Sequence, residues 1–566
     1  MTKFSGTGKR PLRANVTGAV RTTARRIATH EGGVAYERDA ESDLFLLAAT
    51  NMVGEDTFYE RAADRDARFI ELVHRVTAAN PNFIAGFGAR AGQPGDAGGT
   101  ARVADEVGAT GGAGEAGAVG KIGLAQYLRQ SMGMRSAAVV MAAEYVAAGG
   151  ANGRGVIARA LQRPDEPAEL VGYWLAVHGR NLPMPVKRGV ADAVRRLYTE
   201  RAALRYDGLS RQIRMADVVE LTHPQPKDGR QSALFKYLLD RRHHARGSGG
   251  VPQEDRARAD PAVLPMLAAT ADLEAVPDGE RRAVLRARGP QALAEAGFSW
   301  ERLSGWLPGG LDAEAWEAVI PSMGVMALVR NLRNFDRAGI PEAAVETVIA
   351  KLTDPDEVAK ARLFPYQVWA GYAHAPSDDW KRALGRTLDL TVRNVPALDG
   401  TLVVIDTSGS MQAPVSNRSK LARVEVAAVM AMVTARKAGP VDVVIYGQTH
   451  ARVRGLAGLS VLGGVQKIVG LVGAVGHATF GHTAIARHFD PKRHRRVVLF
   501  TDDQQHDSGS VRLDHVPVIY TFNLAGYRPS SLPAGERGRY TLGGFTDATF
   551  EAMRVLESGG NAGWPF

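Results

Sequence analysis

The pattern of apolar residues changes near residue 395, and this change constrains the fold more than any other feature of the 566-residue chain. Before it, apolar side chains recur at three- and four-residue spacing, as in Tyr127, Leu128 and Met132, which is typical of amphipathic helices. After it, short β-branched runs lack polar alternation, which is typical of strands buried on both faces of a sheet. The sequence therefore predicts a helical module over residues 1–395 and an α/β domain over residues 396–566.

Four apolar runs are the predicted strands of the second part. They lie at residues 401–405, 441–446, 496–500 and 516–522. Helical patterns separate them, the clearest at residues 420–436. This alternation predicts a doubly wound parallel sheet, with ligands expected at the carboxyl ends of its strands.

Short helix pairs follow one another in the helical part, which is typical of an α-solenoid. No fixed repeat length can be identified, so the predicted repeats are degenerate. Residues 88–120 hold 11 Gly and 9 Ala, too little large apolar surface to order themselves, and are predicted to be a flexible insert. A second loop, rich in helix-breaking residues, is predicted at residues 246–261.

Composition and motifs exclude several kinds of function. The chain has no cysteine, so disulfides, Cys-ligated zinc, iron–sulfur clusters and thiol catalysis are impossible. It contains no Gly-x-Ser-x-Gly elbow, no Gly-x4-Gly-Lys-Ser/Thr loop and no His-Glu-x-x-His motif. Because these catalytic motifs are missing, we expect that the protein is not an enzyme. No apolar run suits a membrane span or a signal peptide, so a cytoplasmic location is expected.

The first predicted strand leads directly into Asp406, Ser408 and Ser410, whose oxygens can converge at one edge of the sheet. The third strand ends at Asp502, and Thr483 opens a helix between them. Hard oxygen ligands favour Mg²⁺ or Mn²⁺, so these five residues are the predicted metal site.

Two alternatives accompany this prediction. Thr479 lies close to Thr483 and could supply the hydroxyl, and Asp406 with Ser408 could merely cap the following helix. Five histidines in this half fit no zinc template and are expected on the surface or in loops: His477, His482, His488, His494 and His506.

The segment at residues 182–246 carries 14 Lys and Arg against 7 Asp and Glu, most of the chain's net charge of +10. Cations that neutralise phosphates and rings that stack on bases are what RNA binding requires. The candidate contacts are Lys187, Arg188, Arg205, Arg211, Arg214, His223, Lys227 and Lys236, with Tyr198, Tyr206, Phe235 and Tyr237 interleaved. A solvated helix face with core tyrosines is the alternative.

The Asp-x-Ser-x-Ser motif, a loop threonine and a later aspartate resemble the metal-ion-dependent adhesion site of von Willebrand factor A domains. The segments LPMPVKRGVAD at residues 182–192, LTHPQPK at 221–227 and LFKYL at 234–238 resemble the TROVE module of the Ro ribonucleoprotein family. Further pieces at residues 53–60, 323–332 and 362–366 agree with that resemblance.

The resemblance implies a monomeric ring of HEAT-like helical repeats closed by the A-like domain. It implies binding of small noncoding Y-like RNA on the basic outer surface, with His223 in a motif that matters for this. It also implies that single-stranded 3′ ends of misfolded RNA enter the ring, where Arg330 and Arg333 are candidate lining residues. The implied role is RNA quality control or stabilisation, with an exoribonuclease as a possible partner.

Two other functions stay open at this point. In one, the A-like domain captures an acidic protein partner through its metal and the helical part is only a peptide-binding solenoid. In the other, a metal-dependent nuclease, the site lacks the second metal and general base that phosphodiester cleavage usually uses.

Overall fold

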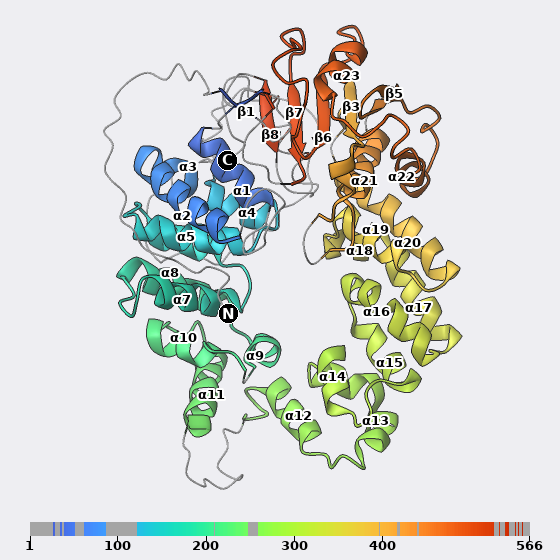
Figure 1. Ribbon diagram of the computed structural model, residues 1–566. Helices are drawn as coiled ribbons and strands as arrows, with labels where there is room; N and C mark the ends of the chain where they lie inside the picture. The colour runs from blue at the N-terminus through green and yellow to red at the C-terminus, as the bar shows by residue number, and fades with distance from the viewer. Residues whose placement is uncertain are drawn as a thin grey trace, which may run out of the picture.

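Helices follow one another along the chain and curve into a ring that a β-sheet closes (Figure 1). This computed structural model describes residues 26–28, 34–36, 39–50, 62–86, 122–208, 210–246, 259–395, 397–415, 419–437, 441–525, 531–532 and 538–542, with residues 550, 553 and 557. The predicted insert at 88–120, the motif at 53–60 and most of the loop at 246–261 lie outside these residues.

The first helices stack in neighbouring layers, in which α2, α5, α7 and α10 contact one another in turn, as do α4, α6 and α8. Their bounds are α1 (Ala40–Thr50), α2 (Ala62–Ala79), α3 (Pro81–Ala85), α4 (Leu124–Gln130), α5 (Ser136–Ala147), α6 (Gly153–Ala160), α7 (Glu166–Val177), α8 (Met184–Leu197), α9 (Glu200–Tyr206), α10 (Met215–Thr222) and α11 (Gly229–Arg246). A short antiparallel pair precedes them, β1 (Arg26–Ala28) and β2 (Val34–Tyr36).

The second half of the helical array leads to the sheet. Its elements are α12 (Pro265–Glu274), α13 (Arg281–Glu295), α14 (Trp300–Trp306), α15 (Ala313–Val319), η2 (Ile320–Ser322), α16 (Val325–Ala338), α17 (Glu342–Thr353), α18 (Pro355–Ala361), α19 (Pro365–Ala373), α20 (Asp378–Thr391) and η3 (Val392–Asn394). The predicted division between residues 395 and 396 stays a prediction.

Helix α8 shows how the local sequence produces this packing. Its buried residues Val186, Val190 and Val194 recur every four positions and place one apolar stripe against its neighbours. Gly189 lies on the same face, where a Cβ atom would stand 2.7 Å from the carbonyl oxygen of Arg154. The absence of a side chain at this position therefore lets α6 and α8 approach closely.

The sheet has six strands in the order β5-β4-β3-β6-β7-β8. The strands are β3 (Thr401–Asp406), β4 (Asp442–Tyr446), β5 (His450–Arg452), β6 (Arg496–Thr501), β7 (Ile519–Asn523) and β8 (Arg539–Leu542). Between β3 and β4 lie η4 (Gly409–Gln412) and α21 (Arg423–Lys437), and between β5 and β6 lie α22 (Val461–Val469) and α23 (Gly481–His488). The four predicted strands are confirmed. The sheet is mixed, since β5 runs antiparallel to β4, and neither short edge strand was predicted.

Both faces of the sheet are buried, as the apolar runs predict. Val403 and Ile405 belong to the large core that includes α21, whereas Leu402 and Val404 belong to a smaller core that includes Ile485 of α23. Successive side chains of a strand point to opposite faces, so an unbroken apolar run feeds both layers.

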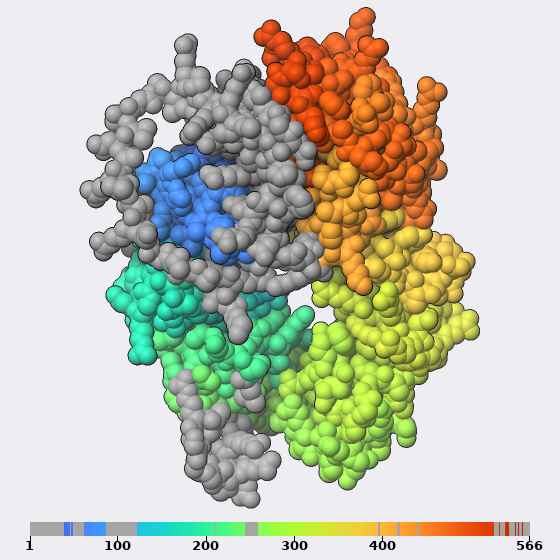
Figure 2. Space-filling view, viewed as in Figure 1, coloured from blue at the N-terminus to red at the C-terminus, as the bar shows by residue number. Residues whose placement is uncertain are grey.

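The helical array contacts the sheet unit at both of its ends. Helix α1 contacts β8, while α19 and α20 contact α21 and α22. Trp369 Nε1 donates to Glu425 Oε1 at 3.1 Å, and the backbone N–H of Val461 donates to Asp389 Oδ1 at 2.9 Å. The space-filling view shows an opening between the two sides of the array (Figure 2). The predicted fold class, a helical-repeat ring closed by an A-like domain, is confirmed.

None of the described helices combines the length and the apolar character that a membrane span requires. Helices α2 and α11 have 18 residues each, and both carry several charged side chains.

We expect Gly189→Ala to lower the free energy of unfolding by about 1–3 kcal/mol, because the new methyl group forces α6 and α8 apart. The control is Gly305→Ala in α14, where a Cβ atom would have no neighbour within 4 Å. That change should raise stability by about 0.5–1 kcal/mol through helix propensity. Urea denaturation of both variants measures the difference, and equal shifts would contradict the close approach.

Candidate functional site

The carboxyl end of β3 brings Asp406, Ser408 and Ser410 into one turn. The backbone N–H of Ser408 donates to Asp406 Oδ1 at 2.9 Å, and the hydroxyl oxygens of Ser408 and Ser410 lie 3.3 Å apart. Asp502 follows β6, the neighbouring strand, and the Ser410 hydroxyl is hydrogen-bonded to it. Four of the five predicted metal ligands therefore meet at the edge of the sheet where the sequence places them.

Two buried carboxylates with little compensating charge define the electrostatics of this cluster. Burial and the adjacent Asp502 carboxylate raise the pKa of Asp406 to about 7. Burial also raises the pKa of Asp502, against the Ser410 hydrogen bond and the nearby Arg423 guanidinium. Arg423 Nη1 lies 3.4 Å from Asp502 Oδ2 and is itself buried. Arg423 thus pairs with one of the two acidic groups, which leaves the cluster suited to a further cation.

Asp502 Oδ1 gives the most direct indication of such a cation. This atom is buried and has no hydrogen-bond partner among the described residues. Buried carboxylate oxygens are normally hydrogen-bonded or bound to a metal, so the donor set fits a hard divalent ion. Asp406, Ser408, Ser410 and Asp502 are the residues that would hold it.

Three polar residues that sequence reasoning missed fix the Asp406 carboxylate. Its Oδ2 accepts from the Thr501 hydroxyl at 2.8 Å and from the Tyr446 hydroxyl at 3.1 Å. Gln505 Nε2 in turn donates to the Tyr446 hydroxyl oxygen at 2.7 Å. Tyr446 ends β4, Thr501 ends β6 and Gln505 follows β6. Their position at or just after strand ends was the one feature of the sequence that could have indicated this role.

The predicted role of Thr483 as a metal ligand stays a prediction. Its side chain is exposed in the first turn of α23, and its backbone N–H donates to Asp507 Oδ2 at 2.6 Å. Thr479 is instead buried, two residues after His477, whose carbonyl accepts from the Gly409 N–H at 3.3 Å. Thr479 and Thr483 therefore both remain candidates, the first on the loop whose His477 contacts the metal-site turn and the second in the first turn of α23.

The histidine prediction is wrong for His482, because α23 buries it, whereas His494 lies in the loop before β6, as one of the predicted alternatives. His482 is 2% exposed in α23, and burial lowers its pKa to about 4. His494 is also buried, and its Nε2 lies 3.0 Å from Asp442 Oδ2.

The basic segment over α8–α11 presents some of its predicted cations to solvent and buries others. Arg188, Arg205, His223, Lys227 and Lys236 are exposed, and Lys187 and Arg211 are half-buried. Arg214 is 1% exposed and its Nη2 donates to Asp207 Oδ2 at 2.6 Å, so the prediction that it contacts RNA is wrong.

Other basic residues of the segment already have partners within the protein. Lys236 pairs with Asp240 one turn away, Arg242 pairs with Asp217, and Arg196 donates to the carbonyl oxygens of Ala158 and Leu161. The aromatic prediction also needs correction, because Tyr198 and Phe235 are buried edge to face with ring centroids 6.5 Å apart. Tyr206 and Tyr237 remain half-buried.

His223 occupies an unusual backbone position. It ends α10 in the left-handed conformation with φ of 48°, and its side chain is exposed. Pro224 follows it and is buried, which helps to end the helix there.

Arg330 and Arg333 are exposed on α16, beside a groove of about 380 Å³. Arg333 Nε donates to the His374 carbonyl oxygen at 3.0 Å. Leu421, in the segment between the metal-site turn and α21, lines the same groove. This helix faces the opening of the ring in Figure 1.

The comparisons with known proteins follow the same architecture. A family model of the TROVE domain matches residues 297–439. The Ro (Rsr) protein of Deinococcus radiodurans has the same fold, with a TM-score of 0.60 and 19% identity over 92% of this chain and 100% of that chain. The chain is similar to the Ro ribonucleoprotein family in sequence and in fold.

Other matches complete this assignment. The RNA-binding protein RO60 of Deinococcus radiodurans is 27% identical over 249 residues, which cover 40% of this chain and 42% of the relative. The sequence match thus spans less than half of that protein. Proximal thread matrix protein 1 of the mussel byssus matches with a TM-score of 0.19 and 16% identity over 32% of this chain and 50% of that one, too slight to inform the fold.

The TROVE match includes α16, with Arg330 and Arg333, and continues through β3 and the turn at Asp406 to α21. The resemblance to the Ro family that the sequence motifs predict is therefore confirmed. The relative RO60 is described as an RNA-binding protein. The individual contact residues stay predictions.

We expect Arg214→Ala to lower the free energy of unfolding by about 3–5 kcal/mol, because it leaves the buried Asp207 carboxylate without its closest charged partner. Arg201→Ala, an exposed cation of α9, is the control and should change stability by less than about 0.5 kcal/mol. Urea denaturation measures both. An Arg214→Ala variant as stable as the control would restore Arg214 as a candidate RNA contact.

Proposed function

We propose that this protein is a nonenzymatic RNA-binding scaffold that holds a small Y-like noncoding RNA on the basic surface of α8–α11. The observation that carries the proposal is a group of exposed cations free of acidic neighbours. Among the described residues, no carboxylate lies within ion-pair distance of Arg188, Arg205 or Lys227. Such cations can neutralise phosphates without first losing an internal partner.

The surface also carries rings that can stack on bases, which favours RNA over a polyanion that has no bases. Arg205 lies over the ring of Tyr206, with its guanidinium carbon 5.5 Å from the ring centroid. His223 stands exposed at the end of α10, where its ring can stack on a base. Lys187, Arg188 and Lys227 supply the phosphate contacts.

The opening of the ring is the proposed path for single-stranded 3′ ends of misfolded RNA. Arg330 and Arg333 lie on α16 beside the groove at the ring's junction with the sheet unit. An extended strand fits such a passage better than a duplex does, because its phosphates and bases are both accessible. RNA quality control in the cytoplasm, together with an exoribonuclease, is the cellular role proposed for this arrangement.

The cluster at the carboxyl end of β3 is the proposed site for Mg²⁺ or Mn²⁺, supported by the unpaired Oδ1 of Asp502. A bound divalent ion would supply an open coordination position for an acidic group of a partner. Capture of an acidic protein through this ion is the second candidate function.

We expect the double variant Lys187→Ala with Arg188→Ala to weaken binding of a structured RNA with a single-stranded 3′ tail by about tenfold. It should also reduce the slope of log affinity against log salt concentration by about two, because two phosphate contacts are lost. Fluorescence anisotropy across a potassium chloride series measures both quantities.

Arg512→Ala is the matched control, since this exposed arginine lies in the sheet unit and pairs only locally with Asp514. Its affinity should equal that of the wild type. Weak, tail-independent binding that the double variant leaves unchanged would refute the RNA proposal and favour the protein-capture function.

We expect Mg²⁺ at 100 times its dissociation constant to raise the free energy of unfolding by about 2.7 kcal/mol, because the ion binds only the folded site. Asp406→Asn should abolish this increase, and Asp514→Asn, an exposed carboxylate, should retain it. Urea denaturation with magnesium chloride or EDTA measures the effect. An unchanged increase in Asp406→Asn would place magnesium binding elsewhere.

A further inference from the structure

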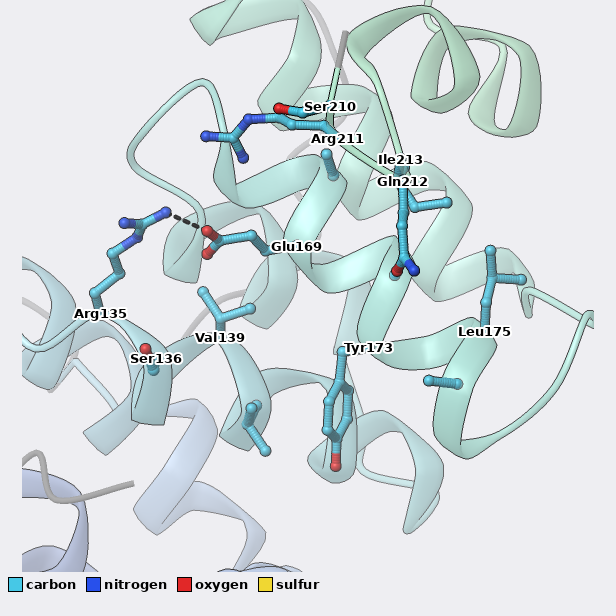
Figure 3. Close-up of a pocket in the computed structure, with 14 residues that line it drawn as sticks. Arg135, Ser136, Val139, Glu169, Tyr173, Leu175, Ser210, Arg211, Gln212 and Ile213 are labelled. Carbon is cyan, nitrogen blue, oxygen red and sulfur yellow. Dashed lines mark hydrogen bonds and ion pairs between the residues drawn. The ribbon is translucent and has the colours of Figure 1, made fainter. Parts of the chain in front are cut away.

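A large pocket lies among α5, α7 and the segment that leads into α10 (Figure 3). Its volume is about 900 Å³, within the range of small-molecule sites. Val139, Leu175 and Ile213 contribute an apolar wall, and Gln212 adds an amide group. The lining combines apolar surface with a few convergent polar groups, as ligand sites do.

Arg211 supplies an available cation at this pocket. Its side chain is half-buried, and no described carboxylate lies within ion-pair distance of its guanidinium. Figure 3 shows it extending to the side of the pocket that holds the Arg135–Glu169 pair. Arg211 acts on Glu169 through its charge without forming an ion pair with it, so an anionic group bound there would meet an arginine that is not tied to a carboxylate.

Glu169 supplies an acceptor on the same side. Its Oε1 accepts from Arg135 Nη2, whereas no hydrogen bond among the described residues reaches Oε2. Arg135 also pairs with Asp165, so its charge is already compensated. The free oxygen of Glu169 is therefore open to an N–H donor of a ligand.

The pocket wall is preformed rather than loose. The backbone N–H of Met215, just after the wall segment, donates to buried Asp207 Oδ1 at 2.9 Å. On the opposite side the Tyr173 hydroxyl donates to buried Glu144 Oε1 at 2.5 Å. These buried contacts fix both walls, so binding need not order them.

We propose that this pocket takes one extruded nucleotide of single-stranded RNA, and that guanosine fits it best. The phosphate lies on Arg211, the base lies on the apolar wall at Val139 and Ile213, and N–H groups of the base donate to Glu169. This inference rests on the proposed RNA-binding function and adds a base-specific site to it.

The chemistry of the lining distinguishes this occupant from others. A fatty acyl chain would leave the free oxygen of Glu169 without a donor, and an acidic peptide would bring carboxylates against Glu169. A base has an apolar face and polar edges in one plane, and guanine carries two adjacent donors, N1–H and the N2 amino group, that match a carboxylate.

The test compares a short uridine oligomer with the same oligomer carrying one central guanosine, using fluorescence anisotropy and the full chain. We expect the guanosine to raise wild-type affinity about tenfold, in line with one good base contact. Glu169→Gln should remove most of this gain, and Ile213→Trp, which fills the pocket, should abolish it. Arg211→Ala should weaken binding of both oligomers and lower the salt slope by about one.

Ser304→Trp, at an exposed position of α14, is the control for adding a large side chain and should keep the guanosine gain. Thermal melting checks that Ile213→Trp is folded, and Glu169→Gln keeps the test decisive if it is not. If the wild type binds both oligomers equally, or the gain survives in Glu169→Gln and in a folded Ile213→Trp, the pocket proposal is overturned while RNA binding stands. If the wild type binds the structured RNA but neither oligomer, the pocket proposal falls and the RNA-binding proposal stands; if it binds none of these RNAs, both proposals fall.

Discussion

Closure of the helical array against one sheet unit is the constraint on which the rest of this structure depends. A helical array has two ends with uncovered faces, and here both ends contact the same α/β unit, α1 at β8 and α19–α20 at α21 and α22. The Trp369–Glu425 hydrogen bond lies at the second junction. Because Glu425 belongs to the helix that Arg423 begins, this junction and the acidic cluster at Asp406 share one structural element.

Buried charge then divides the basic residues into two classes. One class is bound to carboxylates or carbonyl groups inside the helical array and comprises Arg214, Arg242 and Arg196. Arg188 and Lys227 remain exposed and available for a polyanion. The same principle governs the sheet edge, where the buried carboxylates Asp406 and Asp502 lie together and Arg423 is within ion-pair distance of Asp502.

Much of this organisation was predictable because it follows from periodicity and from the position of residues at strand ends. The strands ending at Asp406 and near Asp502 could be located, and parallel neighbours deliver their carboxyl ends to one edge. The choice between Thr483 and Thr479 stays a prediction, because the start of α23 decides how exposed each hydroxyl is, and helix boundaries are poorly encoded locally. Arg214 was misassigned because no local signal distinguishes a phosphate contact from the partner of a buried aspartate.

The sequence by itself determined the helical texture, the apolar strands, the Asp-x-Ser-x-Ser turn and the excess of cations at residues 182–246. Tertiary structure alone decided which cations are free, that Tyr446 and Thr501 hold Asp406, and that α5, α7 and the segment at Arg211 enclose a pocket. The physical reason is that period and composition act over a few residues, whereas burial and ion pairing depend on segments that only the folded ring brings together.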